Sequence, residues 1–233
     1  MPYQTGSSGK LRPVMLMNEL QALAGIHAET LGRGISYCIA RGCGWIVTHY
    51  FIDIREMPTW GEELELTTWP VEHDGLRAIR DFEVRGADGR LMIAATSQWI
   101  MANLETRRPM RLNDVLTDWP ATQERALNAE FDKMPEIELD QNAAISFRVR
   151  YDDIDSNNHV NNTVYIVWAI ESLGMDFLNS HDLTGIKINF KKEVPSGTRT
   201  VVSGYQINGN TTQHVIQSSD TTNASVILTW KPR

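Results

Sequence analysis

The densest group of polar side chains lies between residues 151 and 162, directly before an apolar segment. Asp155, Asn157 and His159 occupy alternate positions within it. If this stretch is extended, every second side chain faces the same side, and a carboxylate, an amide and an imidazole converge on one point. These are group types that enzymes use to move protons, so the spacing indicates a candidate site for acid–base chemistry.

The same residues resemble the start of a calcium-binding loop. Asp153, Asp155 and Asn157 have the spacing of its first three ligands. The sixth position, which requires glycine, is Asn158, and the twelfth, which requires glutamate, is Val164. Calcium binding is therefore disfavoured.

Purely structural interpretations stay open for the rest of the group. Asn161 or Asn162 would cap a following helix whatever the function, and a single histidine such as His159 beside a helix start is often structural. No serine elbow, phosphate loop or His-Glu-x-x-His helix occurs, and Cys38 and Cys43 have neither a nucleophile motif nor zinc-ligand spacing. Neither a metal nor a cofactor is predicted.

The segment after the polar group must be buried. Residues 164–170 leave no polar face over nearly two turns, and a helix that is apolar all round must be surrounded by protein. A curved antiparallel sheet wrapped around one central helix, the hotdog arrangement, would satisfy this. We expect a helix at 163–178, and strands at 144–151, 185–192, 198–207, 213–218 and 224–230.

The first half has the same order of elements. A helix is predicted at 13–31, followed by strands at 45–54, 63–68, 78–85 and 91–102. Residues 107–142 show no strand alternation and are interpreted as a surface connector.

A short echo supports duplication: residues 56–61 and residues 193–197 both place a proline and then a glycine between strands. The prediction is an α+β tandem (double) hotdog. Residues 1–140 would form the first unit with the connector, and residues 141–233 would form the second unit.

Composition limits the class of protein. The chain has 233 residues, 42% hydrophobic, and a net charge of −7, which argues against a nucleic-acid binder. No apolar run reaches the length that spans a bilayer, and residues 1–10 lack the apolar core of a signal peptide. Low cysteine content fits a reducing compartment, so a cytoplasmic location is predicted.

Residues 153–172 are similar to the signature of the plant and bacterial acyl-ACP thioesterases. Further stretches that resemble this family are residues 17–21, 45–48, 58–62, 94–99 and 106–109. The resemblance extends over residues 11–230. It implies hydrolysis of a fatty acyl thioester, with acyl carrier protein as the partner and one catalytic site per chain. By this resemblance, residues 1–140 would shape the acyl pocket and residues 141–233 would carry the catalytic residues.

The resemblance also implies roles. The family's carboxylate, amide and imidazole fall on Asp155, Asn157 and His159, and a glutamate in the following strand falls on Glu193. Glu193 would be the base, directly or through a water oriented by Asn157, while His159 would polarise the carbonyl or share the base role. Asp155 would fix the imidazole, and N–H groups at the helix start near residue 163 would stabilise the oxyanion. Members often carry a cysteine after the glutamate, where this chain has Val194, which puts an acyl-cysteine route in doubt.

Some alternatives stay open at this level. Without the resemblance, Glu193 is interpreted as a solvated carboxylate paired with Lys191 or Lys192. Coenzyme A could replace the carrier protein; a hotdog dehydratase or hydratase and a non-catalytic acyl-binding protein are the other candidates. A homodimer, the preferred chain length and the end of the acyl pocket are not decided by the sequence. Basic residues that would contribute to carrier docking are Arg107, Arg108, Lys191 and Lys192.

Overall fold

The computed structural model describes residues 2–116, 118–137 and 144–233. The chain divides into two compact units, Met1–Phe131 and Asp132–Arg233. The predicted domain boundary at 140/141 lies outside the described residues. No helix within the described ranges is both long enough and apolar enough to cross a bilayer.

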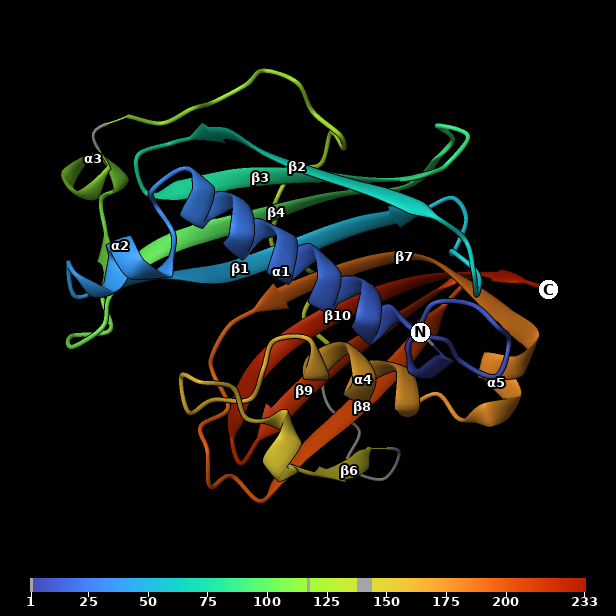
Figure 1. Cartoon of the computed structure of the whole chain (residues 1–233). Coiled ribbons are helices and arrows are strands. Elements are labelled where there is room, and N and C mark those ends of the chain that lie inside the picture. The colour runs from blue at the N-terminus through green and yellow to red at the C-terminus, as the bar shows by residue number, and fades with distance from the viewer. Residues whose placement is uncertain (1, 117, 138–143) are drawn as a thin grey trace. The chain divides into compact units, whose positions relative to one another are not determined.

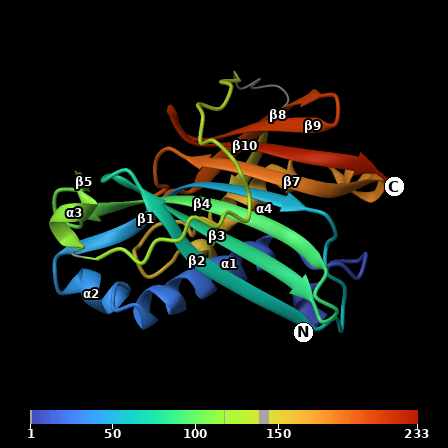
Figure 2. The same ribbon diagram turned by 90° about the horizontal axis from the view of Figure 1, so that it is seen from above.

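The first unit is an antiparallel sheet with one long helix. Its strands follow the order β2-β3-β4-β1, with β5 paired to β4. The helix α1 lies along one face of this sheet (Figure 1, Figure 2). The elements are η1 (Pro2–Gln4), α1 (Pro13–Thr30), α2 (Ile35–Ile39), β1 (Cys43–Ile54), β2 (Leu64–His73), β3 (Arg77–Gly86), β4 (Leu91–Asn103), β5 (Pro109–Met110) and α3 (Leu112–Val115).

Helix α1 forms where the sequence predicts it, because Leu16, Leu20 and Ala24 recur on one face. All three are buried. Pro13 begins the helix, and Gly32 follows its end with a φ of 67° that favours glycine. The short elements α2, β5 and α3 were not predicted.

The connector packs against the outer face of the first sheet. The buried Asp81 carboxylate accepts hydrogen bonds from Arg125 Nε at 3.0 Å and from the Ala126 N–H at 2.8 Å. Trp69 Nε1 donates to the Glu124 carbonyl at 2.9 Å. These contacts show why a segment without regular structure between residues 118 and 131 has a defined path.

The second unit repeats the arrangement. Its sheet follows the order β7-β10-β9-β8-β6, and the short helix α4 crosses its curved face over β8, β9 and β10 (Figure 1). The elements are β6 (Ile145–Arg148), η2 (Tyr151–Asp153), α4 (Val164–Glu171), α5 (Met175–Ser180), β7 (His181–Phe190), β8 (Thr200–Asn208), β9 (Thr211–Ser218) and β10 (Thr221–Pro232). The predicted tandem hotdog is confirmed.

Several predicted elements of the second unit are wrong in extent, and β7, predicted from residue 185, begins at His181. The helix predicted at 163–178 is two helices, because Gly174 between α4 and α5 has a φ of 78°. The strand predicted at 144–151 is only Ile145–Arg148, since the chain turns at η2, where Asp153 accepts from the backbone and side chain of Arg150.

The central helix is buried as its composition requires. Val164, Tyr165, Ile166, Trp168 and Ala169 are all buried on α4. A helix enclosed on nearly every side holds its N-terminal end in a fixed place, and the polar residues 155–159 precede that end.

Candidate active site

Residues 155–159 form a tight turn, and not the extended stretch on which the expected convergence of their side chains was conditional. The Asp155 N–H donates to the His159 carbonyl at 2.8 Å, and the Asn158 N–H donates to the Asp155 carbonyl at 3.1 Å. Asn158 has a φ of 61°, a left-handed conformation that asparagine tolerates better than most residues. Ile154 and Val160 pair as a bridge at the base of the turn. The turn, rather than strand alternation, brings the polar residues together.

The Asp155 carboxylate holds the inside of this turn. Its Oδ1 atom accepts from the Asn157 N–H at 2.8 Å and lies 3.4 Å from the His159 N–H. Asp155 thus contacts the backbone of His159. The predicted role of Asp155, to fix the tautomer and orientation of the imidazole, stays a prediction.

His159 and Glu193 meet, although 34 positions separate them in the sequence. The Nε2 atom of His159 lies 3.2 Å from the Oε2 atom of Glu193. The histidine side chain is 14% exposed and the glutamate side chain 43% exposed, so solvent reaches the carboxylate. An imidazole facing a solvated carboxylate is an arrangement that can deprotonate a water molecule.

Main-chain hydrogen bonds keep the two segments in register. The Val160 N–H donates to the Val194 carbonyl at 2.8 Å, and the Ser196 N–H donates to the Asn158 carbonyl at 2.8 Å. His159 and Pro195 form a bridge between these bonds. The histidine and the glutamate are therefore held in place by backbone hydrogen bonds and not by their side-chain contact alone.

Asn157 lies at the exposed tip of the turn. Its Nδ2 atom is 3.5 Å from the Asp155 carboxylate, and among the described residues the amide has no other side-chain partner. The amide is thus placed beside Asp155 and open to solvent.

The N-cap residue of α4 is Thr163, which makes no side-chain capping bond, so the prediction of Asn161 or Asn162 as the cap is wrong. Asn161 instead bonds the residues at the helix start. Its side-chain oxygen accepts from both the N–H and the hydroxyl of Thr163 at 3.0 Å, and its carbonyl accepts from the Val164 N–H at 2.9 Å. The first N–H groups expected to stabilise an oxyanion are therefore already bonded.

Tyr165 is a residue of this site that sequence reasoning missed. Its hydroxyl accepts the N–H of Val194, the residue after Glu193, at 3.1 Å. Burial is the main cause that raises the pKa of Tyr165, so the hydroxyl stays protonated and neutral. The signal was available: a phenol hydroxyl inside an otherwise apolar helix needs a partner.

The first unit contains the same turn without these side chains. The Gly6 N–H donates to the Lys10 carbonyl at 2.9 Å, the Leu11 N–H donates to the Pro58 carbonyl at 2.7 Å, and the Trp60 N–H donates to the Gly9 carbonyl at 3.0 Å. Each bond has its counterpart around residues 155–160 and 194–196 in the second unit.

Superposing these bonds by their order in the chain pairs the residues of the two turns. Asp155, Asn157, His159 and Glu193 correspond to Gly6, Ser8, Lys10 and Met57. The predicted similarity between residues 56–61 and 193–197 exists, but the prolines are shifted by one residue. Gly61 corresponds to Gly197, with φ of 82° and 90°, whereas Pro58 corresponds to Val194 and not to Pro195. The first unit thus lacks the acid–base groups.

Metal binding has no support among the described residues, where no cluster of three or more His, Cys, Asp or Glu side chains could hold an ion. The two cysteines are buried and free.

Comparison with known families gives the context for this geometry. Residues 1–119 match the family model of the acyl-ACP thioesterase N-terminal domain, and residues 136–232 match that of the C-terminal domain. The chain belongs to the acyl-ACP thioesterase family. Relatives in this family include two chloroplastic oleoyl-acyl carrier protein thioesterases of Arabidopsis thaliana, 27% identical over 212 residues and 30% identical over 208 residues. The chain spans 58% and 57% of the length of these two relatives, with 82% of its own length matched.

Solved structures of this family have the same fold. A Lactobacillus plantarum protein assigned as an oleoyl thioesterase is 26% identical, with a TM-score of 0.86 over 99% of this chain and 92% of that one. An acyl-ACP thioesterase from Bacteroides thetaiotaomicron is 23% identical, with a TM-score of 0.87 over 99% of this chain and 94% of that one.

Proposed function

We propose that the protein hydrolyses the thioester of a fatty acyl-ACP and releases the free fatty acid and holo-ACP, which ends chain elongation in fatty acid biosynthesis. The observation that carries this proposal is the 3.2 Å contact between His159 and Glu193 on a turn fixed by backbone hydrogen bonds. Membership of the family supports a thioester carbonyl as the group attacked.

In this mechanism water is the nucleophile. Glu193, which is solvated, accepts a proton from water as the water oxygen bonds to the thioester carbon, and His159 polarises the carbonyl or shares the proton. The C–S bond then breaks, and the thiolate leaves and takes up a proton. Thiolate is a good leaving group, so strong acid assistance is not required.

The remaining residues position this pair. Asn157, with an exposed amide, orients the water, and Asp155 holds the backbone of His159 in place. Val194 has no thiol, so an acyl-cysteine intermediate has no nucleophile at that position. Oxyanion donors come from N–H groups beyond Val164 in the first turn of α4, because those of Thr163 and Val164 already bond to Asn161.

Thiol release from a panel of acyl-ACPs tests the proposal. We expect His159→Ala and Glu193→Gln each to lower kcat by about a hundredfold or more, the usual scale for a lost acid–base group. Glu171→Gln is the matched control, since it removes another exposed carboxylate of the same unit. Near-normal turnover in both site variants would refute the assignment of the site.

The same assay separates the alternatives. Faster hydrolysis of acyl-CoA than of matched acyl-ACP would assign coenzyme A as the carrier. Conversion of β-hydroxyacyl or enoyl substrates without thiol release would identify a dehydratase or hydratase, and retention of ligand without turnover an acyl-binding protein. The acyl pocket in the first unit, the homodimer and the cytoplasmic location stay predictions.

A further inference from the structure

The segment that carries Glu193 lies beyond the end of the sheet. Strand β7 ends at Phe190, which pairs with Ala224 of β10, and residues 191–194 belong to no strand. Next to Ala224, β10 contains a bulge, because Asn223 is an extra residue between two of the pairs that β10 forms with β9. A bulge residue has no direct partner in the ladder, and its side chain can point out of the regular pattern of the sheet. Contacts other than strand pairing must therefore hold Glu193 in place.

Asn223 binds this segment through both its main chain and its side chain. Its carbonyl accepts from the Lys191 N–H at 2.8 Å and from the Lys192 N–H at 3.1 Å. Its side-chain nitrogen Nδ2 donates to the Lys192 carbonyl at 3.1 Å and to the Glu193 carbonyl at 3.3 Å. Both partners are carbonyl oxygens, which can only accept, so the nitrogen and not the oxygen of the amide must face them. Asn223 is 1% exposed, so bulk water does not compete for these bonds.

The two side-chain bonds act on the two peptide groups that meet at the Cα atom of Glu193. The Lys192 carbonyl belongs to the peptide group before this atom, and the Glu193 carbonyl belongs to the one after it. Because each peptide group is planar, the orientations of the two groups set φ and ψ of Glu193. These dihedral angles determine where the Cα–Cβ bond points. The amide of Asn223 therefore determines the direction from which the carboxylate approaches His159.

The second of these peptide groups is also held at its other end. Its N–H, which is that of Val194, donates to the Tyr165 hydroxyl at 3.1 Å. A side chain of β10 and a side chain of α4 thus bind the carbonyl and the N–H of one peptide group. Val194 and Asn223 are both buried, so rotation of this group would leave buried polar atoms without partners. The peptide group after Glu193 is therefore fixed in orientation.

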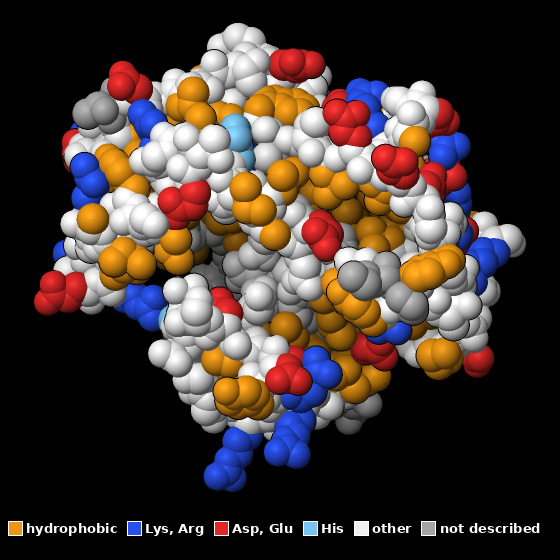
Figure 3. Space-filling view, in the orientation of Figure 1, with side chains coloured by type: hydrophobic (Ala, Val, Ile, Leu, Met, Phe, Trp, Pro, Cys, Tyr) orange, Lys and Arg blue, Asp and Glu red, His pale blue; other side chains and the backbone are white. Residues whose placement is uncertain are grey.

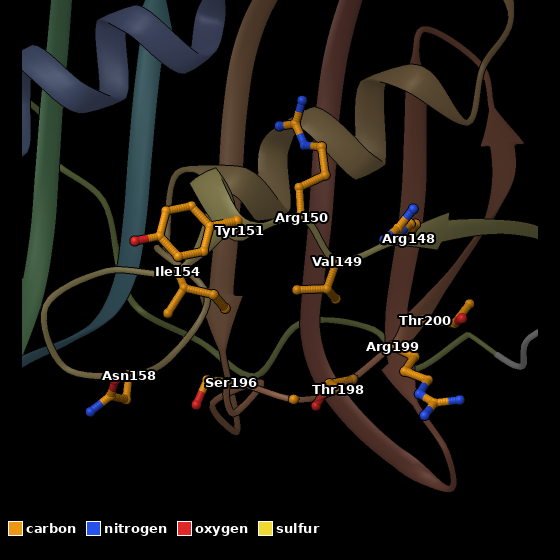
Figure 4. Close-up of a pocket in the computed structure, with 11 residues that line it drawn as sticks. Arg148, Val149, Arg150, Tyr151, Ile154, Asn158, Ser196, Thr198, Arg199 and Thr200 are labelled. Atoms are coloured by element: carbon orange, nitrogen blue, oxygen red, sulfur yellow. The ribbon is translucent and has the colours of Figure 1, made fainter.

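Further along the chain, the same segment meets the catalytic turn beside a pocket of about 830 Å³. The pocket is lined in part by Asn158 and Ser196, which lie on neighbouring loops (Figure 4). The Ser196 N–H donates to the Asn158 carbonyl at 2.8 Å, and the Val194 carbonyl also accepts from the turn. These bonds begin one residue after Glu193. On the side of Glu193 that faces β7, the hydrogen bonds to the backbone come from Asn223.

Asn223 acts on Glu193 through geometry and not through charge. Its amide is neutral, whereas acidic and basic side chains are interspersed over the face of the molecule that Figure 3 draws. Single charges on such a surface interact only weakly with an exposed carboxylate, because water and salt screen them. The placement of the Glu193 carboxylate therefore depends on the bonded contacts of its backbone.

We propose that Asn223 is a positioning residue for the base: it holds the backbone of Glu193 so that the carboxylate lies 3.2 Å from the His159 ring. The inference rests on the proposed function and deepens it. The carboxylate is 43% exposed, so without this support it can turn into solvent at little cost. Misplacement of a reacting group by about 1 Å can lower the rate about a hundredfold.

The test replaces Asn223 by leucine, which has a similar shape but no donor. Thiol release from acyl-ACP gives kcat and KM separately. We expect Asn223→Leu to lower kcat by about tenfold to a hundredfold and to change KM by less than about twofold, because the base is misplaced while substrate binding is retained. If Asn223→Leu does not fold, Asn223→Ala takes its place, since it also removes the donor and adds no bulk.

Thr212→Val is the matched control. It removes another buried hydrogen-bonding group of the same unit, near the opposite end of the β9–β10 hairpin. Its kcat should stay within about twofold of wild type, because distant sites act independently. A loss of kcat in the control equal to that of Asn223→Leu would overturn the inference, since it would assign the effect to general loss of structure.

A double-mutant cycle with Glu193→Gln separates positioning from other roles of Asn223. If Asn223 acts through the carboxylate of Glu193, it has no base to position in the Glu193→Gln background. Asn223→Leu should then lower kcat there by less than about twofold, although it has its full effect in the wild type. An equal fold loss in both backgrounds, or no loss in either, would overturn the inference.

Hydrogen exchange decides the inference even if the wild type hydrolyses no thioester, a result that would refute the proposed function alone. The Val194 N–H reports on the peptide group that Asn223 holds, and the Val226 N–H in the middle of β10 reports on the sheet. We expect exchange at Val194, relative to Val226, to be at least about tenfold faster in Asn223→Leu than in wild type. In Thr212→Val the ratio should not change. An unchanged ratio in Asn223→Leu would refute the inference.

Discussion

Lowering the pH should destabilise the protein through one buried histidine, His214 on β9. Its two ring nitrogens contact the hydroxyl groups of Ser172 and Thr212. Ser172 donates its hydroxyl proton to the Ala169 carbonyl at 2.7 Å, so it accepts from His214 Nδ1, 3.3 Å away. Thr212 accepts from Trp230 Nε1 at 2.9 Å and has its own hydroxyl proton to donate to His214 Nε2, 2.8 Å away.

This network fits a neutral ring whose Nδ1 proton is donated to Ser172 and whose Nε2 atom accepts from Thr212. A second proton on Nε2 would force the Thr212 hydroxyl proton to turn away from the ring, and the charge would be buried. Burial lowers the pKa of His214 from 6.5 to about 3. In the unfolded chain the ring regains its ordinary pKa and binds a proton more readily, so stability is highest above about pH 6.5 and falls as the pH drops toward 3.

The magnitude follows from these two values. Two-state linkage gives a loss of about 2 kcal/mol in the free energy of unfolding between pH 7 and pH 5 from this residue alone. The result depends little on the folded value, because that pKa lies well below 5. Urea denaturation of the wild type and of His214→Gln at both pH values measures this loss. The contributions of the other histidines are the same in both proteins, so the difference between the two losses belongs to His214.

We expect the wild type to lose about 2 kcal/mol more than His214→Gln between the two pH values. Equal losses would refute the reasoning. If the variant does not fold, NMR of the imidazole in the wild type replaces it: the expected ring is neutral at pH 5 with the proton on Nδ1, and titration near pH 6.5 would contradict the network.

Two further predictions concern the site. Tyr165→Phe leaves the buried Val194 N–H without its acceptor, so we expect the free energy of unfolding, measured by urea denaturation, to fall by about 1–3 kcal/mol. The variant should lower kcat less than Glu193→Gln does. Unchanged stability would count against this hydrogen bond. Iodoacetamide at neutral pH should leave turnover unchanged, because both cysteines are buried and burial raises the pKa of Cys38 to about 12. Rapid inactivation would instead indicate a catalytic thiol.

The sequence allowed the fold to be predicted because its signals are local. The apolar run at 164–170 required enclosure, and strand alternation in both halves supplied the sheets. The errors arose where one residue changes the backbone direction. Gly174 ends α4 early, and Asn158, through its left-handed conformation, closes a turn in a segment that was considered as an extended stretch. An Asx pattern at Asp155, whose side chain accepts from the N–H two residues later, was the signal overlooked.

The site was predictable only in part. Asp155, Asn157 and His159 are close in sequence, so composition alone drew attention to them. The approach of Glu193 depends on long-range pairing between the turn and residues 194–196, which no periodicity reveals, and only family resemblance indicated it. The pocket beside Asn158 likewise depends on pairing between β6 and β8.

The first unit offers a natural comparison for the catalytic turn. Gly6 has no side chain, and yet its turn closes with the same main-chain bonds that surround Asp155. Forming the loop therefore does not require a carboxylate, an imidazole or a glutamate. The turn of the second unit therefore does not need its four polar side chains in order to form. The reason that these residue types occur there must lie in the function of the folded turn.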